Sequence, residues 1–189
     1  TTKVKFLIDF VTGVSALAYF VIIAAATKQH FSSDKYPWGM HLISILSLIG
    51  VSFFMYTAFV LTLSHPVVVL LLIAAAFVLF LWAARHSSQR QLGLAFAEDF
   101  KTSGIITTGP WRFVRHPFYV SYVTFWFACA LGTLHVVSII VFGALLFIYV
   151  YSALREEAWL SGGDHGTTYL TYQRSTGFFL PTRVLRKVS

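Results

Sequence analysis

The chain has 189 residues, of which 57% are hydrophobic and only 11% are charged, and its formal net charge is +7. In soluble domains about a quarter of the residues are charged, so this composition excludes an ordinary soluble protein and indicates one compact membrane domain. In so apolar a chain, basic loops beside an anionic membrane leaflet explain the positive charge better than nucleic acid binding does.

The first half of the chain contains three apolar runs with the length of membrane-spanning helices: residues 6–27, 39–63 and 66–84. Pro66 begins the third run and suits the first turn of a helix, where its missing N–H is not needed. Only Ser64 and His65 lie between the second and third runs, so we expect a tight antiparallel hairpin. Asp9 lies near the start of the first run, where a capping or interfacial role is favoured over a proton relay.

The second half alternates polar and apolar segments. Residues 85–116 are polar and irregular, with five cations and two acids. Two apolar runs, 117–132 and 134–154, follow, and a polar tail occupies 155–189. The first of these runs is short for a full crossing, so the pair predicts a hairpin that is tilted or crosses only part of the bilayer. The chain is therefore expected to be an all-α, polytopic membrane protein with about five transmembrane helices, the last two forming a hairpin.

Lysine and arginine gather in three polar segments. Residues 28–38 carry two, 85–116 five and 155–189 five, whereas the two tight turns carry none. Basic loops face the cytosol, and five helices with an outside N-terminus place all three segments there. We therefore expect the N-terminus outside, the C-terminus in the cytosol, and a location in a bacterial inner membrane or the endoplasmic reticulum.

The predicted hairpin brings two polar pairs together at this cytosolic boundary. Arg115 and His116 directly precede it, and Glu156 and Glu157 follow it, so the pairs are expected to be neighbours. For the basic pair two readings are open. One is a polar pocket at a helix start, and the other is a plain helix start whose basic side chains reach lipid headgroups.

The acidic pair needs a partner, because carboxylates at a helix C-terminus are disfavoured by the helix dipole. Two explanations are open: a cationic ligand, or a salt bridge to Arg112, Arg115 or Arg155. Four tyrosines of the same segments could line a polar pocket there: Tyr119, Tyr122, Tyr169 and Tyr172.

Other catalytic motifs are absent from the sequence. The seven histidines show no spacing that would bind a metal ion, so no metal site is expected. Neither a glycine-rich nucleotide loop nor a G-x-S-x-G turn occurs.

Residues 107–122 read TTGPWRFVRHPFYVSY. They resemble the signature of the integral-membrane methyltransferases, a family that includes isoprenylcysteine carboxyl methyltransferase and the phospholipid N-methyltransferases. The signature falls on Thr107 or Thr108, Gly109, Pro110, Trp111, Arg115, His116, Pro117 and Tyr119. A second block of this family, after the last helix, is similar to Glu156, Glu157, Leu160, Gly166, Tyr169, Tyr172 and Pro181. The resemblance covers about residues 85–182, half of the chain.

The resemblance implies that the two blocks bind S-adenosylmethionine in a pocket open to the cytosol, and that a lipophilic acceptor enters from the membrane. The implied cofactor contacts are His116, Pro117, Tyr119 and Glu157, with Tyr169 and Tyr172 as further candidates. The candidate catalytic residues are Glu156, Arg115 and Arg155. The chemistry agrees, because carboxylates can hold the methionine ammonium, aromatic faces the sulfonium, and a helix N-terminus the methionine carboxylate.

On this interpretation residues 1–84 form three N-terminal transmembrane helices and residues 85–189 the methyltransferase core. Ser121 stands where the closest family members have glycine, and Arg155 is the only arginine near the end of the last helix. The acceptor therefore stays open among a carboxylate, an amine, a thiol and a phenol. The alternatives are an NADPH-dependent membrane reductase of the sterol-reductase type and a non-enzymatic membrane carrier. Membrane lipids are expected partners, and the oligomeric state is not indicated.

Overall fold

The computed structural model describes residues 2–30, 38–87, 105–163 and 166–181. The described chain is helical and contains no strand. Its elements are α1 (Thr2–His30), α2 (Trp38–Phe59), α3 (Pro66–Ser87), the short 3₁₀ helix η1 (Gly109–Arg112), α4 (Pro117–Thr133), α5 (Val136–Gly162) and α6 (Gly166–Ser175).

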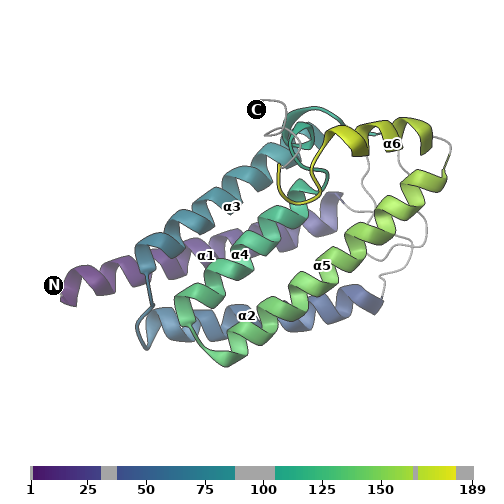
Figure 1. The fold of residues 1–189 in the computed structure, drawn as a ribbon. Coiled ribbons are helices and arrows are strands. Elements are labelled where there is room, and N and C mark those ends of the chain that lie inside the picture. Colours follow the sequence, from purple (N-terminus) through teal and green to yellow (C-terminus); the bar gives the residue numbers. More distant parts are fainter. Residues whose placement is uncertain (1, 31–37, 88–104, 164–165, 182–189) are drawn as a thin grey trace.

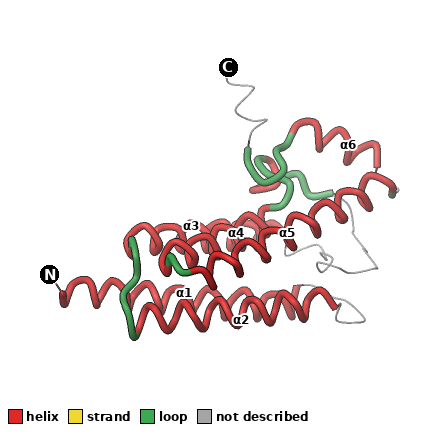
Figure 2. The backbone as a smooth tube through the Cα atoms, turned by 60° about the horizontal axis from the view of Figure 1, so that its bottom comes forward, coloured by secondary structure: helices red, strands yellow, loops and turns green. Residues whose placement is uncertain are grey.

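The five long helices form an up-and-down bundle in two tiers. Helices α1 and α2 lie side by side, and α3, α4 and α5 lie over them (Figures 1 and 2). Among the described residues, four helices are long and apolar enough to cross a membrane: α1, α2, α3 and α5. Helix α4 has 17 residues and packs most extensively against α3. The expectation of an all-α membrane protein with about five transmembrane helices, the fourth of them short, is confirmed.

The centre of the bundle is built from large aromatic side chains. Tyr19 of α1, Phe54 of α2, and Phe125 and Trp126 of α4 are all buried in one hydrophobic cluster. Tyr19 and Phe125 meet edge to face with their ring centroids 4.8 Å apart, a favourable arrangement of aromatic quadrupoles. Gly50 lets α2 approach this cluster, because a Cβ there would lie 2.8 Å from the Trp126 ring and 3.0 Å from Val141.

Gly50→Ala should therefore lower the free energy of unfolding by about 1–3 kcal/mol through overpacking. Gly143→Ala is the matched control, because no atom lies within 4 Å of its added Cβ. It should leave the stability unchanged or raise it by up to about 1 kcal/mol, as alanine does in helices. Thermal unfolding of both variants in detergent measures the difference. Equal midpoints would contradict close packing at Gly50.

The turn between α2 and α3 is longer than the sequence indicates. Helix α2 ends at Phe59 and not at residue 63, so six residues connect the two helices. The backbone leaves the helix because it bonds elsewhere. The Leu63 N–H donates to Asp9 Oδ2 at 3.4 Å, and the Ser64 N–H donates to the Gly132 carbonyl at 2.7 Å. Asp9 thus caps this turn.

Ser121 ties three helices together in the interior. Its Oγ donates to the Ala76 carbonyl of α3 at 2.9 Å and also bonds to the Tyr19 hydroxyl of α1. Because the serine hydroxyl has one proton and gives it to Ala76, the tyrosine is the donor in the second bond. Ser121, which stands where the closest family members have glycine, therefore links α4 to α1.

The C-terminal region holds more helix than the sequence indicates. Helix α5 continues to Gly162, eight residues beyond the predicted end at 154, so Glu156 and Glu157 lie inside it. The predicted polar tail contains α6, where Tyr169 and Tyr172 are both buried. Residues three apart lie on one face of a helix, so the Y-x-x-Y spacing turns both rings inward.

Candidate functional site

The end of α3, the start of α4 and the end of α5 lie toward the same end of the bundle (Figure 1). Polar side chains gather there. We call Arg115, His116, Glu156, Glu157 and Gln173 the polar cluster. They come from the segment before α4, from the last turns of α5 and from α6. The structure thus joins the two sequence blocks that resemble the methyltransferase signature.

Glycine and proline shape the segment before α4. Gly109 has φ of +61°, which glycine adopts without strain, and Pro110 and Pro117 lie in the first turns of η1 and α4. Trp111 is buried, and its carbonyl accepts a hydrogen bond from the Tyr172 hydroxyl at 2.6 Å. The signature segment is therefore anchored to α6.

A short backbone pairing attaches the same segment to the chain that follows α6. The Arg115 N–H donates to the Gly177 carbonyl at 2.9 Å, and the Gly177 N–H donates to the Phe113 carbonyl at 3.3 Å. Val114 and Gly177 form an isolated parallel bridge. This pairing orders both stretches without a sheet.

Glu157 is the centre of the polar cluster. Its Oε1 accepts from Arg115 Nε at 2.6 Å and from His116 Nε2 at 3.0 Å. Its Oε2 accepts from Gln173 Nε2 at 2.8 Å and from Arg115 Nη2 at 3.5 Å. Since a carboxylate can only accept, the imidazole carries its proton on Nε2 in this bond. Glu157 therefore has both oxygens occupied by protein donors.

Arg115 is equally committed to protein partners. Its Nη1 donates to the Gln173 carbonyl at 3.2 Å and to the Thr176 carbonyl. The side chains of Arg115 and Glu157 are only 9% and 8% exposed. A buried ion pair is tolerated when further hydrogen bonds satisfy its remaining groups, as they do here. Among the arginines that could pair with the acidic residues, Arg115 makes the pair.

Glu156 has a different environment from its neighbour. Successive residues of a helix point about 100° apart, so Glu157 faces inward and Glu156 lies at the edge. The Glu156 side chain is 31% exposed, and its Oε2 lies 3.8 Å from His116 Nδ1. That contact is longer than a hydrogen bond, so the carboxylate keeps free acceptor capacity beside His116.

Aromatic rings border His116 on several sides. Tyr119 stacks on it with centroids 5.7 Å apart, and Tyr149 stacks on Tyr119, also at 5.7 Å. Phe178 and Phe179 approach the imidazole edge to face at 5.1 Å and 6.1 Å. The cluster therefore combines carboxylates with ring faces, the two features that bind organic cations.

Tyr169 and Tyr172 line the cluster from α6. Burial raises the pKa of both phenols above the ordinary value, so both are neutral at physiological pH. The Tyr169 hydroxyl is buried near Glu157, but no described residue lies at the distance and angle of a good hydrogen bond to it. It therefore keeps unused hydrogen-bonding capacity inside the cluster.

The structure brings most of the sequence-predicted site residues together at this end of the bundle: Arg115, His116, Pro117, Tyr119, Glu156, Glu157, Tyr169 and Tyr172. Arg155 is not among them. It is exposed on α5 and forms no ion pair with another described residue. Arg112 is likewise exposed.

Sequence reasoning missed Gln173, Thr176, Phe178 and Phe179. Gln173 follows Tyr169 by four residues and so shares its helical face, a signal that is visible once α6 is recognised as a helix. The other three lie after the helix, where no periodic pattern marks them. Contacts of Arg115 with Thr176, Gly177 and Phe178 bring them to the site.

Gly166→Ala should displace α6 and thereby weaken the polar cluster. A Cβ at this position would overlap the Ser161 carbonyl oxygen, which is backbone and cannot rotate away. Gly162→Ala is the control, because its added Cβ meets nothing within 4 Å. We expect the first variant alone to gain protease sensitivity between α5 and α6. Equal cleavage of both variants would contradict this.

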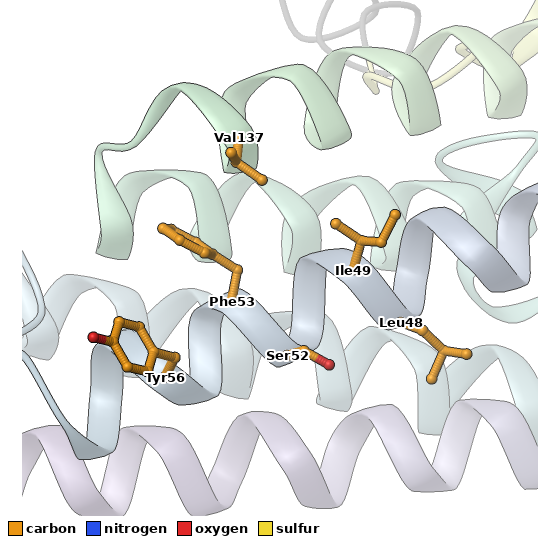
Figure 3. Close-up of a pocket in the computed structure, with 6 residues that line it drawn as sticks. All are labelled: Leu48, Ile49, Ser52, Phe53, Tyr56 and Val137. Atoms are coloured by element: carbon orange, nitrogen blue, oxygen red, sulfur yellow. The ribbon is translucent and has the colours of Figure 1, made fainter.

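An open apolar groove lies elsewhere on the bundle (Figure 3). It is lined by residues of α2 and the start of α5: Leu48, Ile49, Ser52, Phe53, Tyr56 and Val137. Val137 is 20 residues before Glu157 on α5, a separation of about 30 Å along the helix. With no charged side chain, the groove is suited to lipid and is not part of the polar cluster.

Comparison with known families identifies the matching segment. Residues 70–162 match the model of the phospholipid methyltransferase family. The matched segment includes α4 and α5 and therefore Arg115, His116, Glu156 and Glu157, and it ends before α6. No match to a curated protein or to a solved structure was found. The resemblance to the integral-membrane methyltransferases is confirmed over this segment.

Proposed function

We propose that this chain, a membrane methyltransferase by the family match of residues 70–162, transfers a methyl group from S-adenosylmethionine to a lipophilic acceptor. One observation supports the proposal most strongly. A partly exposed carboxylate, Glu156, lies beside His116 and a stack of tyrosine rings at the end of an apolar bundle.

The charges of the polar cluster suit a cationic cofactor. Arg115 offsets the charge of Glu157, and Glu156 has no lysine or arginine partner among the described residues. S-Adenosylmethionine carries an ammonium and a sulfonium, and carboxylates and aromatic faces attract such groups. The free Glu156 oxygen and the Tyr169 hydroxyl supply the acceptors that an ammonium needs.

The roles of the residues differ in this proposal. Glu156 holds the ammonium, and Tyr119, together with the other rings that border His116, provides the aromatic surroundings of the sulfonium. The first turn of α4, which begins at Pro117 and has no side-chain cap, receives the methionine carboxylate. Glu157 and Arg115 keep His116 and α6 in place, so both are positioning residues.

When bound, the cofactor would supply the methyl group: the acceptor lone pair forms the bond to the methyl carbon, and the carbon–sulfur bond breaks with its electron pair left on sulfur. A carboxylate, thiol or phenol reacts as its anion and an amine as the neutral base, so no proton has to leave during the transfer itself. This reaction needs alignment and exclusion of water more than proton transfer. The stacked rings beside His116, of which Tyr149 is buried, limit the access of water. The acceptor reaches them from the bilayer between the apolar helices.

We infer that the polar cluster faces the cytosol, with the N-terminus outside. The distribution of lysine and arginine supports this orientation. Residues 85–189 act as the methyltransferase core in this proposal, and residues 1–84 anchor it.

Binding and transfer by the purified protein in lipid nanodiscs test the proposal. Calorimetry with S-adenosylhomocysteine should show saturable binding, and NADPH should not bind. Tritiated S-adenosylmethionine is then offered with four probes that share one chain: hexadecanoic acid, hexadecylamine, hexadecanethiol and 4-hexadecylphenol. Label should reach one of these classes. Binding of NADPH in place of S-adenosylhomocysteine would contradict the proposal and favour a reductase, and binding of neither would favour a carrier.

A further inference from the structure

A stacked pair of phenylalanines follows α6 and has no part in the roles described above. The rings of Phe178 and Phe179 are almost parallel, at 7°, with centroids 4.6 Å apart. Both make T-shaped contacts with the imidazole of His116. The pair is therefore part of the wall of the polar cluster.

Arg115 holds the pair in place. Its backbone N–H donates to the carbonyls of Gly177 and Phe178, at 2.9 Å and 3.2 Å, and its guanidinium lies over the Phe178 ring, 5.6 Å from the centroid. Phe178 is thus in contact with a cation and with a second ring. Phe179 is partly exposed, and no other described ring stacks on it.

We propose that Phe179 stacks against the adenine of S-adenosylmethionine. This inference rests on the proposed function. It concerns the adenine, for which the charged groups of the polar cluster provide no binding partner. A purine needs a flat apolar surface, and each ring that stacks on a base contributes to affinity without hydrogen-bond readout. Phe179 offers such a surface within ring contact of His116. Glu156, which would hold the ammonium, lies beside Nδ1 of the same imidazole, so the two ends of the cofactor would be bound on either side of His116.

The position of the pair favours the cofactor over the acceptor. The pair lies after α6, outside the apolar helices. In the proposed function, a lipophilic acceptor enters from between those helices. Aromatic residues at a membrane boundary also anchor proteins in lipid headgroups. Phe113 serves as the control for that role, because it is exposed near the same end of the bundle and packs on Trp82, with no ring contact to His116 among the described residues.

Calorimetry with three probes tests the assignment. S-Adenosylhomocysteine contains both halves of the cofactor, methylthioadenosine keeps the adenine but lacks the amino acid, and S-methylmethionine keeps the amino acid but lacks the adenine. Phe179→Leu retains apolar volume and removes the ring. Phe179→Tyr retains the ring. Phe113→Leu is the control, and thermal unfolding reports folding of each variant.

Phe179→Leu should weaken binding of both adenine probes about 5- to 10-fold and leave S-methylmethionine unchanged. Phe179→Tyr should bind all probes as the wild type does, and so should Phe113→Leu. Wild-type affinity of Phe179→Leu for methylthioadenosine, or an equal loss for all three probes, would overturn the inference. Absence of S-adenosylhomocysteine binding to the wild type would instead overturn the proposed function.

Discussion

Arg115→Ala is expected to lower the free energy of unfolding by about 3–5 kcal/mol, because it leaves the buried Glu157 carboxylate without its cation. The side chain contacts three segments at once: Glu157 on α5, Gln173 on α6, and Thr176 beyond α6. Removing it should therefore release α6 and the segment after it, and binding of S-adenosylhomocysteine should be lost.

Two further variants make this prediction sharp. Arg155→Ala removes an exposed arginine of α5 that has no described ion pair, and it should change the stability by less than about 0.5 kcal/mol. Arg115→Lys keeps the charge but cannot reproduce the forked hydrogen bonds, so we expect an intermediate loss. Thermal unfolding in detergent gives the order. If Arg115→Ala unfolds at the wild-type temperature, Arg115 does not hold α5, α6 and the segment after α6 together.

Glu156→Gln and Glu157→Gln are expected to have different effects, although the two residues are adjacent. Glu156 has little contact with protein donors and is 31% exposed, so its amide should leave the fold intact. Binding of S-adenosylhomocysteine and of S-methylmethionine should weaken about 10- to 100-fold, which corresponds to loss of a charge-assisted hydrogen bond. Methylthioadenosine, which lacks the ammonium, should bind normally.

Glu157→Gln should act on stability first. Both Glu157 oxygens accept from protein donors, and a glutamine places an NH₂ group against one of them. We expect a lower unfolding temperature together with weaker binding of all three probes. Calorimetry and thermal unfolding of the pair of variants separate the roles. Loss of S-methylmethionine binding in Glu157→Gln alone, with full stability, would reverse the assignment of the two glutamates.

The sequence alone predicts the membrane class and the order of the helices. Apolar runs of about 20 residues have few alternatives to membrane-spanning helices, because their backbone groups must be satisfied within the segment. Pro66 and Pro117 mark two helix starts, because proline suits the first helical position, and both residues begin a helix in the structure. The meeting of the two signature blocks also follows from the sequence, since a short turn returns α5 to the membrane face where α4 begins.

Other features required the folded chain. The capping of the α2–α3 turn by Asp9 brings together residues 54 positions apart, and the tie from Ser121 to Tyr19 spans 102 positions. No local pattern encodes such contacts, because each depends on how three helices pack. The continuation of α5 to Gly162 and the presence of α6 also depend on tertiary packing, because short polar helical segments are marginally stable without packing partners.

By itself, the sequence determined that this is an apolar, helical membrane protein with two methyltransferase-like blocks at one membrane face, because hydrophobic length, proline position and motif order are properties of the chain. The tertiary structure decided which glutamate is enclosed and which is free. Glu156 and Glu157 are alike in sequence and in helix propensity. A rotation of about 100° turns one toward Arg115 and Gln173 and leaves the other at the edge beside His116, and only the packing of α4, α5 and α6 sets that rotation.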